Sequence, residues 1–135
     1  MPPIPISQIP SLLDDHLAAI PELSGVFIGW QAGQLTPPTD ALWLRPVCNA
    51  GETTGAEKGA GGYSRRKGTY LIDVFVPSNV DAADAWNMAA VLEKAFRREC
   101  IGGLQTEDPH TANMGTDETT QYSVRVTIPW WCWAA

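Results

Sequence analysis

Apolar residues recur along this chain at two periods, and the period separates predicted helices from predicted strands. Over Ser7–Ile20 the spacing is three or four residues, which predicts an amphipathic helix ended by Pro21. A second helical pattern covers about Asp81–Glu99, after a start signal at Ser78–Asp81 and before the stop Gly102-Gly103. The residues expected to face the core from this second helix are Ala85, Met88, Ala89, Leu92, Ala95 and Phe96.

Four segments have the pattern of strands. Thr69–Val76 is apolar on both alternating faces, which predicts a central strand, whereas Thr120–Ile128 is apolar on one face only. Gly25–Trp30 and Ala41–Val47 are shorter candidates. We interpret the polar stretch Leu104–Glu118 as a loop with one short strand at its start. The apolar face of the last strand consists of Tyr122, Val124, Val126 and Ile128, and we expect it to pack on the second helix.

A glycine-rich segment, Asn49–Gly62, interrupts this order and contains no large apolar residue. It predicts a mobile loop between two strands. The order of helix, strands, long loop, strand, helix and strand predicts an α+β fold, with a mostly antiparallel sheet packed against two helices. The 135 residues fit one domain, 1–135, with no linker inside it.

The composition narrows the function. A net charge of −6 and an isoelectric point near 4.7 disfavour a nucleic-acid binder, which needs clustered cations. Only 18% of residues are charged and six are tryptophan, which favours a surface that is buried in an assembly. The N-terminus lacks a signal-peptide pattern and no apolar run is long enough to span a membrane, so we expect a protein made in a cytoplasm.

No pattern of catalytic, cofactor-binding or metal-binding residues stands out, and we expect no enzyme activity. The glycine-rich segment lacks the phosphate-loop spacing and precedes a strand. The three cysteines are far apart, as in a reduced protein without a zinc site. We interpret His16 as a partly buried structural residue and His110 as a solvated turn residue.

The densest basic run is Ser64–Lys67, directly before the central strand. One interpretation is a solvated entrance to that strand. The other is a docking patch for an acidic neighbour, such as another copy of the chain.

The segment Gly61–Pro77, Gly-Gly-Tyr-Ser-Arg-Arg-Lys-Gly-Thr-Tyr-Leu-Ile-Asp-Val-Phe-Val-Pro, resembles a conserved pattern of small phage proteins. These are the tail-terminator, or tail-completion, proteins of long-tailed phages and prophages, together with a related prophage family of unassigned function. An alanine-rich helix follows, here Ala82–Phe96, and then a terminal strand, here Val124–Trp131. The resemblance covers nearly the whole chain.

This resemblance implies a structural virion protein of the tail and neck. Members form a ring, usually a hexamer, which caps the head-proximal end of the tail tube, stops its polymerisation and joins it to the head-side connector. DNA passes through the ring without sequence-specific binding, and an acidic lumen would let it slide. The expected partners are therefore other copies of the chain, the tail tube protein and the head-closure protein, with no membrane and no cofactor. The candidate subunit-contact residues are Tyr63, Arg65, Arg66, Lys67 and Trp130.

Two alternatives stay open at this point. One is another component of the neck, such as a head-closure or minor tail protein. The other is a small cytosolic enzyme or binding protein whose site lies between subunits and includes Cys48 or His16.

Overall fold

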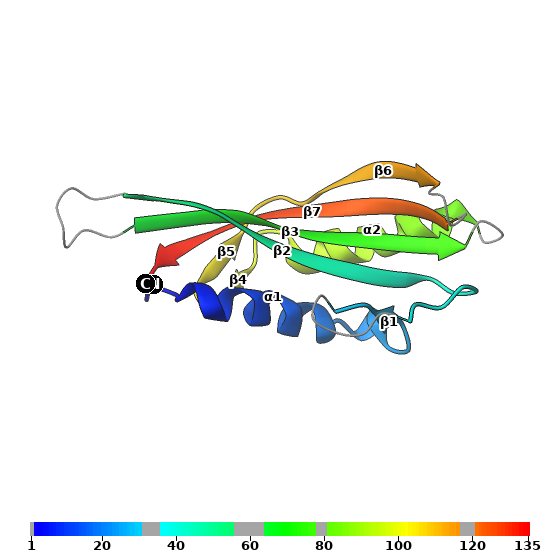
Figure 1. Cartoon of the computed structure of the whole chain (residues 1–135), viewed down its shortest axis with the longest axis horizontal. Coiled ribbons are helices and arrows are strands. Elements are labelled where there is room, and N and C mark those ends of the chain that lie inside the picture. Colours follow the sequence, from blue (N-terminus) through cyan, green and yellow to red (C-terminus); the bar gives the residue numbers. More distant parts are fainter. Residues whose placement is uncertain (1, 31–35, 56–63, 78–80, 117–120) are drawn as a thin grey trace.

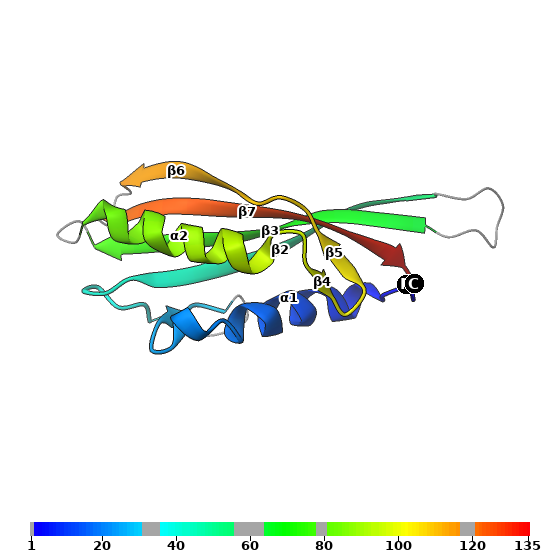
Figure 2. The same ribbon diagram turned by 180° about the vertical axis from the view of Figure 1, so that it is seen from behind.

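Two helices cover one face of a twisted sheet in this chain (Figures 1 and 2). The computed structural model describes residues 2–30, 36–55, 64–77, 81–116 and 121–135. The helical elements are η1 (Ile6–Gln8), α1 (Ile9–Ala18), η2 (Pro21–Leu23) and α2 (Ala82–Phe96). The strands are β1 (Phe27–Ile28), β2 (Trp43–Gly55), β3 (Ser64–Pro77), β4 (Cys100–Ile101), β5 (Leu104–Thr106), β6 (His110–Thr116) and β7 (Gln121–Ala134).

Strand β3 is the centre of the sheet. It pairs antiparallel with β2 on one side and, over its full length from Ser64 to Pro77, with β7 on the other. The strand order is β1-β2-β3-β7-β5-β4, and β6 pairs with the first part of β7. Among the described strands only the short β1 is parallel to its neighbour, β2, and an isolated bridge joins Ile4 in parallel to Ala134. These described elements confirm the predicted α+β fold with a mostly antiparallel sheet.

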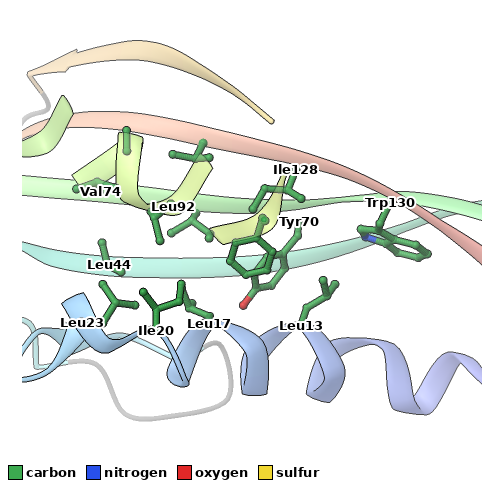
Figure 3. Packing of buried hydrophobic residues seen from close by; sticks show 14 of the residues in the cluster. Leu13, Leu17, Ile20, Leu23, Leu44, Tyr70, Val74, Leu92, Ile128 and Trp130 are labelled. Atoms are coloured by element: carbon green, nitrogen blue, oxygen red, sulfur yellow. The ribbon is translucent and has the colours of Figure 1, made fainter. Parts of the chain in front are cut away.

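The core lies between the helices and one face of the sheet (Figure 3). Every second residue of β3, from Tyr70 to Val76, is fully buried there. Strand β7 adds Val124, Val126 and Ile128, each without exposed surface, as the alternation predicted. The helices contribute Ile9, Leu13 and Leu17 from α1 and Ala85, Ala89, Leu92 and Phe96 from α2.

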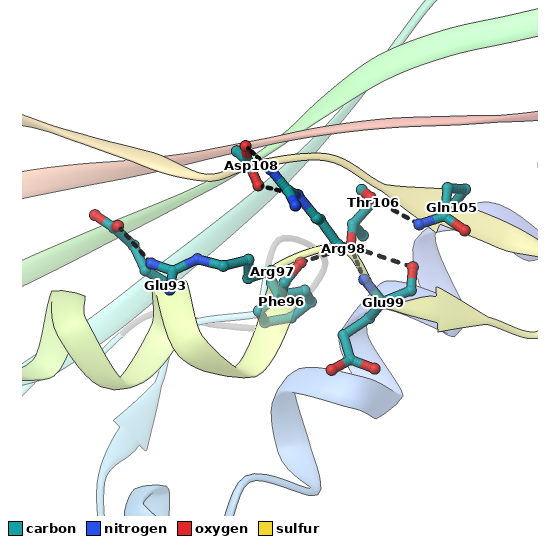
Figure 4. Close-up of polar contacts among 8 residues, drawn as sticks. All are labelled: Glu93, Phe96, Arg97, Arg98, Glu99, Gln105, Thr106 and Asp108. Atoms are coloured by element: carbon teal, nitrogen blue, oxygen red, sulfur yellow. Dashed lines mark hydrogen bonds and ion pairs between the residues drawn. The ribbon is translucent and has the colours of Figure 1, made fainter.

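Helix α2 begins where the sequence predicts and ends earlier. The Asp81 carboxylate accepts a hydrogen bond from the Ala83 N–H at 2.9 Å and caps the first turn. The helix stops at Phe96, where the Thr106 hydroxyl donates to the last helical carbonyl at 2.5 Å (Figure 4). Gly102 and Gly103, with φ of 58° and 95°, form the turn between β4 and β5 and do not end the helix as expected.

The predicted loop over residues 49–62 is wrong for its first half. β2 continues through Gly55, and Thr53 and Thr54 pair with Arg66 and Arg65 after a register shift that follows Ala50. Residues 56–62 lie outside the described part of the chain. The glycine and threonine residues in the second half of β2 show no apolar alternation, so the sequence did not predict a strand there. Hydrogen-bonded pairing with β3 nevertheless holds this segment as a strand, because pairing outweighs the weak preference of these residues for other conformations.

Two further strand segments were missed at the C-terminal end. The expected loop over residues 104–118 contains β6 as well as β5, and β7 continues beyond Ile128 through Pro129 to Ala134. Proline is tolerated because the Pro129 carbonyl accepts from the Glu107 N–H at 2.8 Å, on the edge away from β3. The N and C=O groups of one strand residue point to the same side, so β3 loses no hydrogen bond at Pro129.

Replacement of Val126 by Asp should lower the free energy of unfolding by about 3 kcal/mol or more, because it buries a carboxylate without a partner. Chemical denaturation measures this loss. Thr127→Asp is the matched control, since Thr127 is the next residue of β7 and points to the opposite, uncovered face. Equal destabilisation by the two variants would contradict the assignment of faces.

Candidate assembly interface

The basic run predicted as a docking patch is divided between the two faces of β3. Successive strand residues point to opposite sides, so Arg65 and Lys67 lie on the face that no helix covers. Arg66 points to the helix side, opposite Cys132. Tyr63, the remaining candidate from this segment, lies outside the described residues.

Arg65 lies against an aromatic pair at the end of β7. Its guanidinium carbon is 4.3 Å from the centroid of the Trp131 ring, a cation–π contact. The Trp131 and Trp133 rings meet edge to face at 5.8 Å. These side chains are half-buried, and the neighbouring Lys67 is exposed. The uncovered face therefore presents apolar rings and cations side by side at this end of the sheet.

Trp130 is not part of that surface, which corrects its place among the contact candidates. It is 1% exposed and packs on the helix side of the sheet, opposite Gly68. A Cβ atom at Gly68 would collide with the Trp130 indole and with the Asn49 carbonyl oxygen. The strand alternation places Trp131, and not Trp130, on the uncovered face.

Arg66 is held at the helix side of the same strands. Its Nε donates to the Thr53 hydroxyl at 3.1 Å, while its Nη1 is buried without an acceptor among the described residues. Burial raises the pKa of the nearby Cys132 thiol, and the positive charge of Arg66 offsets part of that shift. Arg66 therefore belongs to the helix side of β3 and not to the uncovered face.

The middle of the uncovered face carries an ion network that sequence reasoning missed. Asp73 of β3 is 4% exposed and accepts hydrogen bonds from Arg125 at 2.7 Å and from Arg45 at 3.1 Å. The Asp73 carboxylate raises the pKa of Arg125, chiefly through this hydrogen bond. Residues 45, 73 and 125 occupy one row of the strand register, and only the pairing of the three strands brings them together. One carboxylate balances only one of the two guanidinium groups, so the row keeps one positive charge.

Aromatic residues flank this network. Trp43 stacks on Phe75 with ring centroids 4.4 Å apart, and the Arg45 guanidinium lies 5.0 Å from the Phe75 centroid. Phe27 meets Trp43 at an angle and is 37% exposed. Trp43 and Phe75 are themselves only 5% and 7% exposed, so the exposed aromatic surface beside the network comes from Phe27.

The other basic group of the chain, at the end of α2, is paired locally (Figure 4). Arg98 binds Asp108 through two hydrogen bonds, of 2.7 and 2.9 Å, and Arg97 lies 3.7 Å from Glu93. Among the described residues Arg65 and Lys67 have no such carboxylate partner. Arg65 and Lys67 of the uncovered face thus share this lack of a described carboxylate partner with Arg66 and Lys94 on the helix side.

His16 and Cys48, the residues that the sequence offered for a catalytic or binding site, are held in packing contacts or partly buried. His16 makes a 2.8 Å hydrogen bond with the Ala95 carbonyl and packs its ring edge-on against Phe96, as expected of a structural histidine. Burial raises the pKa of the Cys48 thiol to about 11, which keeps it protonated near neutral pH. Burial also raises the pKa of Asp14, which accepts a 2.5 Å hydrogen bond from the Tyr70 hydroxyl.

Within the described ranges, no three His, Cys, Asp or Glu side chains gather as a metal site would require. The helices of those ranges include none long and apolar enough to cross a membrane.

The described elements define a small domain of the α+β class. This chain belongs to the phage tail terminator protein family, whose profile matches residues 8–130. One solved protein structure superposes with a TM-score of 0.66 at 18% identity, over 93% of this chain and 95% of its own. That similarity confirms the fold. A search of curated proteins found no match.

Replacement of Gly68 by Ala should destabilise the protein by about 2 kcal/mol or more, because the methyl group has no space between the Asn49 carbonyl and Trp130. Thermal unfolding monitored by tryptophan fluorescence would measure this, since Trp130 lies at the site. Lys67→Ala, one residue away and exposed, should change stability little. A Gly68→Ala variant as stable as wild type would show that Trp130 can move.

Proposed function

We propose that this protein forms a closed ring at the head-proximal end of a phage tail tube, where it ends tube polymerisation and joins the tail to the head-side connector. The family match over residues 8–130 carries the proposal. A tail tube has rotational symmetry, so a cap that contacts every tube subunit equally must be cyclic. Six copies would match a tube of six-fold symmetry. The function is structural, without catalysis, and the chain acts as one domain over residues 1–135.

A cyclic ring needs a heterologous interface, in which one surface of a subunit meets a different surface of the next. The two layers of the fold supply two dissimilar surfaces. One is the uncovered sheet face, with Arg65, Lys67, Trp131 and the Arg45–Asp73–Arg125 network. The other is the outer side of the helix layer.

DNA would pass through the centre of such a ring on its way from head to tail. A net charge of −6 weakens attachment to phosphates, so the DNA slides. The cations of the uncovered sheet face would then be turned away from the DNA path, toward protein. The remaining partners are the tail tube protein and the head-side connector of a long-tailed virion.

The ring itself is tested by negative-stain electron microscopy and mass photometry of the purified protein, alone and with tail tube protein. We expect closed rings of uniform size, and we expect small amounts of the protein to arrest tube growth at one end. A chain that stays monomeric at high concentration and in the presence of tube ends would contradict the terminator proposal.

Loss of the free cations at the start of β3 should weaken assembly. The variant Arg65→Gln/Lys67→Gln should remain folded and self-associate about tenfold less tightly, with a shallower dependence on salt than wild type. Analytical ultracentrifugation at several salt concentrations measures both. Arg97→Gln/Arg98→Gln removes the same charge from the end of α2 and is the matched control. If both double variants assemble as wild type does, the start of β3 is only a solvated strand entrance.

A further inference from the structure

We propose that the uncovered sheet face, centred on the Arg45–Asp73–Arg125 network, docks on the α1 side of the helix layer of a second copy of this chain. The proposal rests on the ring proposed above and names the two surfaces that build it. It moves the centre of the contact from the start of β3 to the middle of the sheet.

The first observation is the charge of the sheet face. Its described strand residues carry four cations, Arg45, Arg65, Lys67 and Arg125, against the single carboxylate of Asp73. The difference, four minus one, is three positive charges in a chain of net charge −6. Arg45 and Arg125 retain 42% and 36% exposure of their side chains although both bind Asp73. Their outer N–H groups therefore remain available to a carboxylate from outside.

The second observation is the opposite charge of the α1 side. From Pro2 to Trp30 every charged residue is acidic: Asp14, Asp15 and Glu22. Asp14 is bound to Tyr70, whereas Asp15 and Glu22 are exposed. A sheet face with three surplus positive charges and an α1 segment without a Lys or Arg are electrostatic complements, although Lys94 of α2 lies beside that segment.

The third observation is a groove beside those carboxylates. A cavity of about 570 Å³ lies between the C-terminal end of α1 and the second half of α2. Its lining is formed by His16, Ala19, Ile20, Pro21, Glu22, Ala90, Val91, Lys94 and Ala95. Glu22 lies at the same groove. The sheet face offers apolar side chains that are only half-buried, among them Val47, Leu71 and Trp131. The groove is mostly apolar and carries one acidic and one basic residue, Glu22 and Lys94, so its fit to the sheet face is chiefly apolar, with Glu22 as the member that can meet a cation.

The arrangement of the two surfaces also suits a ring. α2 lies over one side of the sheet and α1 runs along its β2 edge, so the α1 side and the docking face point in different directions (Figures 1 and 2). In a ring of six, the directions to the two neighbours of a subunit diverge by about 120°, which requires contact surfaces on different sides. Two surfaces on one side would close a dimer and leave no growing end.

DNA is a weaker occupant for this face. Arg45 and Arg125 are fixed on Asp73, and in the strand register the apolar pair Val47 and Leu71 separates this row from Lys67 and Arg65. Phosphate tracking favours mobile cations in a continuous stripe, without intervening carboxylates. The geometry therefore points to a protein surface that carries carboxylates.

Single neutralisations test the electrostatic match. Arg45→Gln leaves Asp73 paired with Arg125, so the fold should persist while self-association weakens about tenfold. Glu22→Gln, on the other surface, should weaken it similarly, and the double variant should lose less than the product of the two effects. Arg98→Gln, which also removes an arginine from an ion pair, should assemble as wild type does. Sedimentation velocity measures association, and circular dichroism confirms folding.

Cross-linking tests the contact directly, in a Cys100→Ser background. A chain with Thr127→Cys on the sheet face is mixed with a chain carrying Ala19→Cys in the groove and treated with a short bifunctional thiol reagent. We expect mixed dimers joined through these two positions, identified by peptide mass. Asn87→Cys, exposed on the first half of α2, replaces Ala19→Cys in the control and should give none.

The outcomes separate this docking from the ring itself. Rings that form without the Thr127–Ala19 cross-link and tolerate Arg45→Gln would overturn the docking and leave the ring proposal standing. Duplex DNA that binds wild type and is lost in Arg45→Gln would also overturn it, in favour of a phosphate-contacting face. Mixed dimers from a protein that never closes into rings would support the docking and contradict the ring.

Discussion

Tyr70, Ile72, Val74 and Val76 lose all solvent exposure where the helices meet β3, and the rest of the molecule is arranged around that contact. Full burial of one such side chain stabilises a fold by roughly 1.5–3 kcal/mol. β3 pairs with β2 on one side and with β7 along its whole length. Paired residues point to the same face of a sheet, so the residues of β3 that face the core decide which residues of β2 and β7 also face it. A shift of one residue in either register would turn every core side chain of that strand outward.

The same alternation sorts the polar residues of the three long strands. With the even-numbered residues of β3 committed to the core, Arg65, Lys67 and Asp73 must face the uncovered side. Asp73 is tolerated there at 4% exposure because two arginines from adjacent strands satisfy it. The surplus charge of the face is thus a consequence of register and does not require a dedicated binding loop.

Long periodic segments could be predicted from the sequence, and the ends of elements could not. The alternation over Thr120–Ile128 predicted the core face of β7, because one wet and one buried side leave a clear period. β6 and the second half of β2 gave no such signal, since they are rich in glycine, threonine and asparagine. These segments are strands because their backbones pair with a neighbouring strand.

For the candidate site, too, the sequence showed which residues cluster along the chain but not which face of the sheet each one occupies. The basic run was visible as a cluster, but its splitting between two faces follows only once β3 is known to extend back to Ser64. Trp130 and Trp131 are equivalent in composition, and one residue of register decides that the first is in the core. The Arg45–Asp73–Arg125 row joins three strands, and only their pairing brings it together.

A charge difference between two opposite surfaces would also decide which complexes do not form. In the proposed docking, two sheet faces brought together repel through three surplus positive charges each, and two α1 surfaces repel through their carboxylates. A two-fold dimer must pair like with like, so it is disfavoured relative to a head-to-tail contact. The head-to-tail contact repeats with a fixed rotation and either closes or grows. In that docking, the charge difference favours head-to-tail association over a two-fold dimer, and the rotation between subunits decides whether the assembly closes.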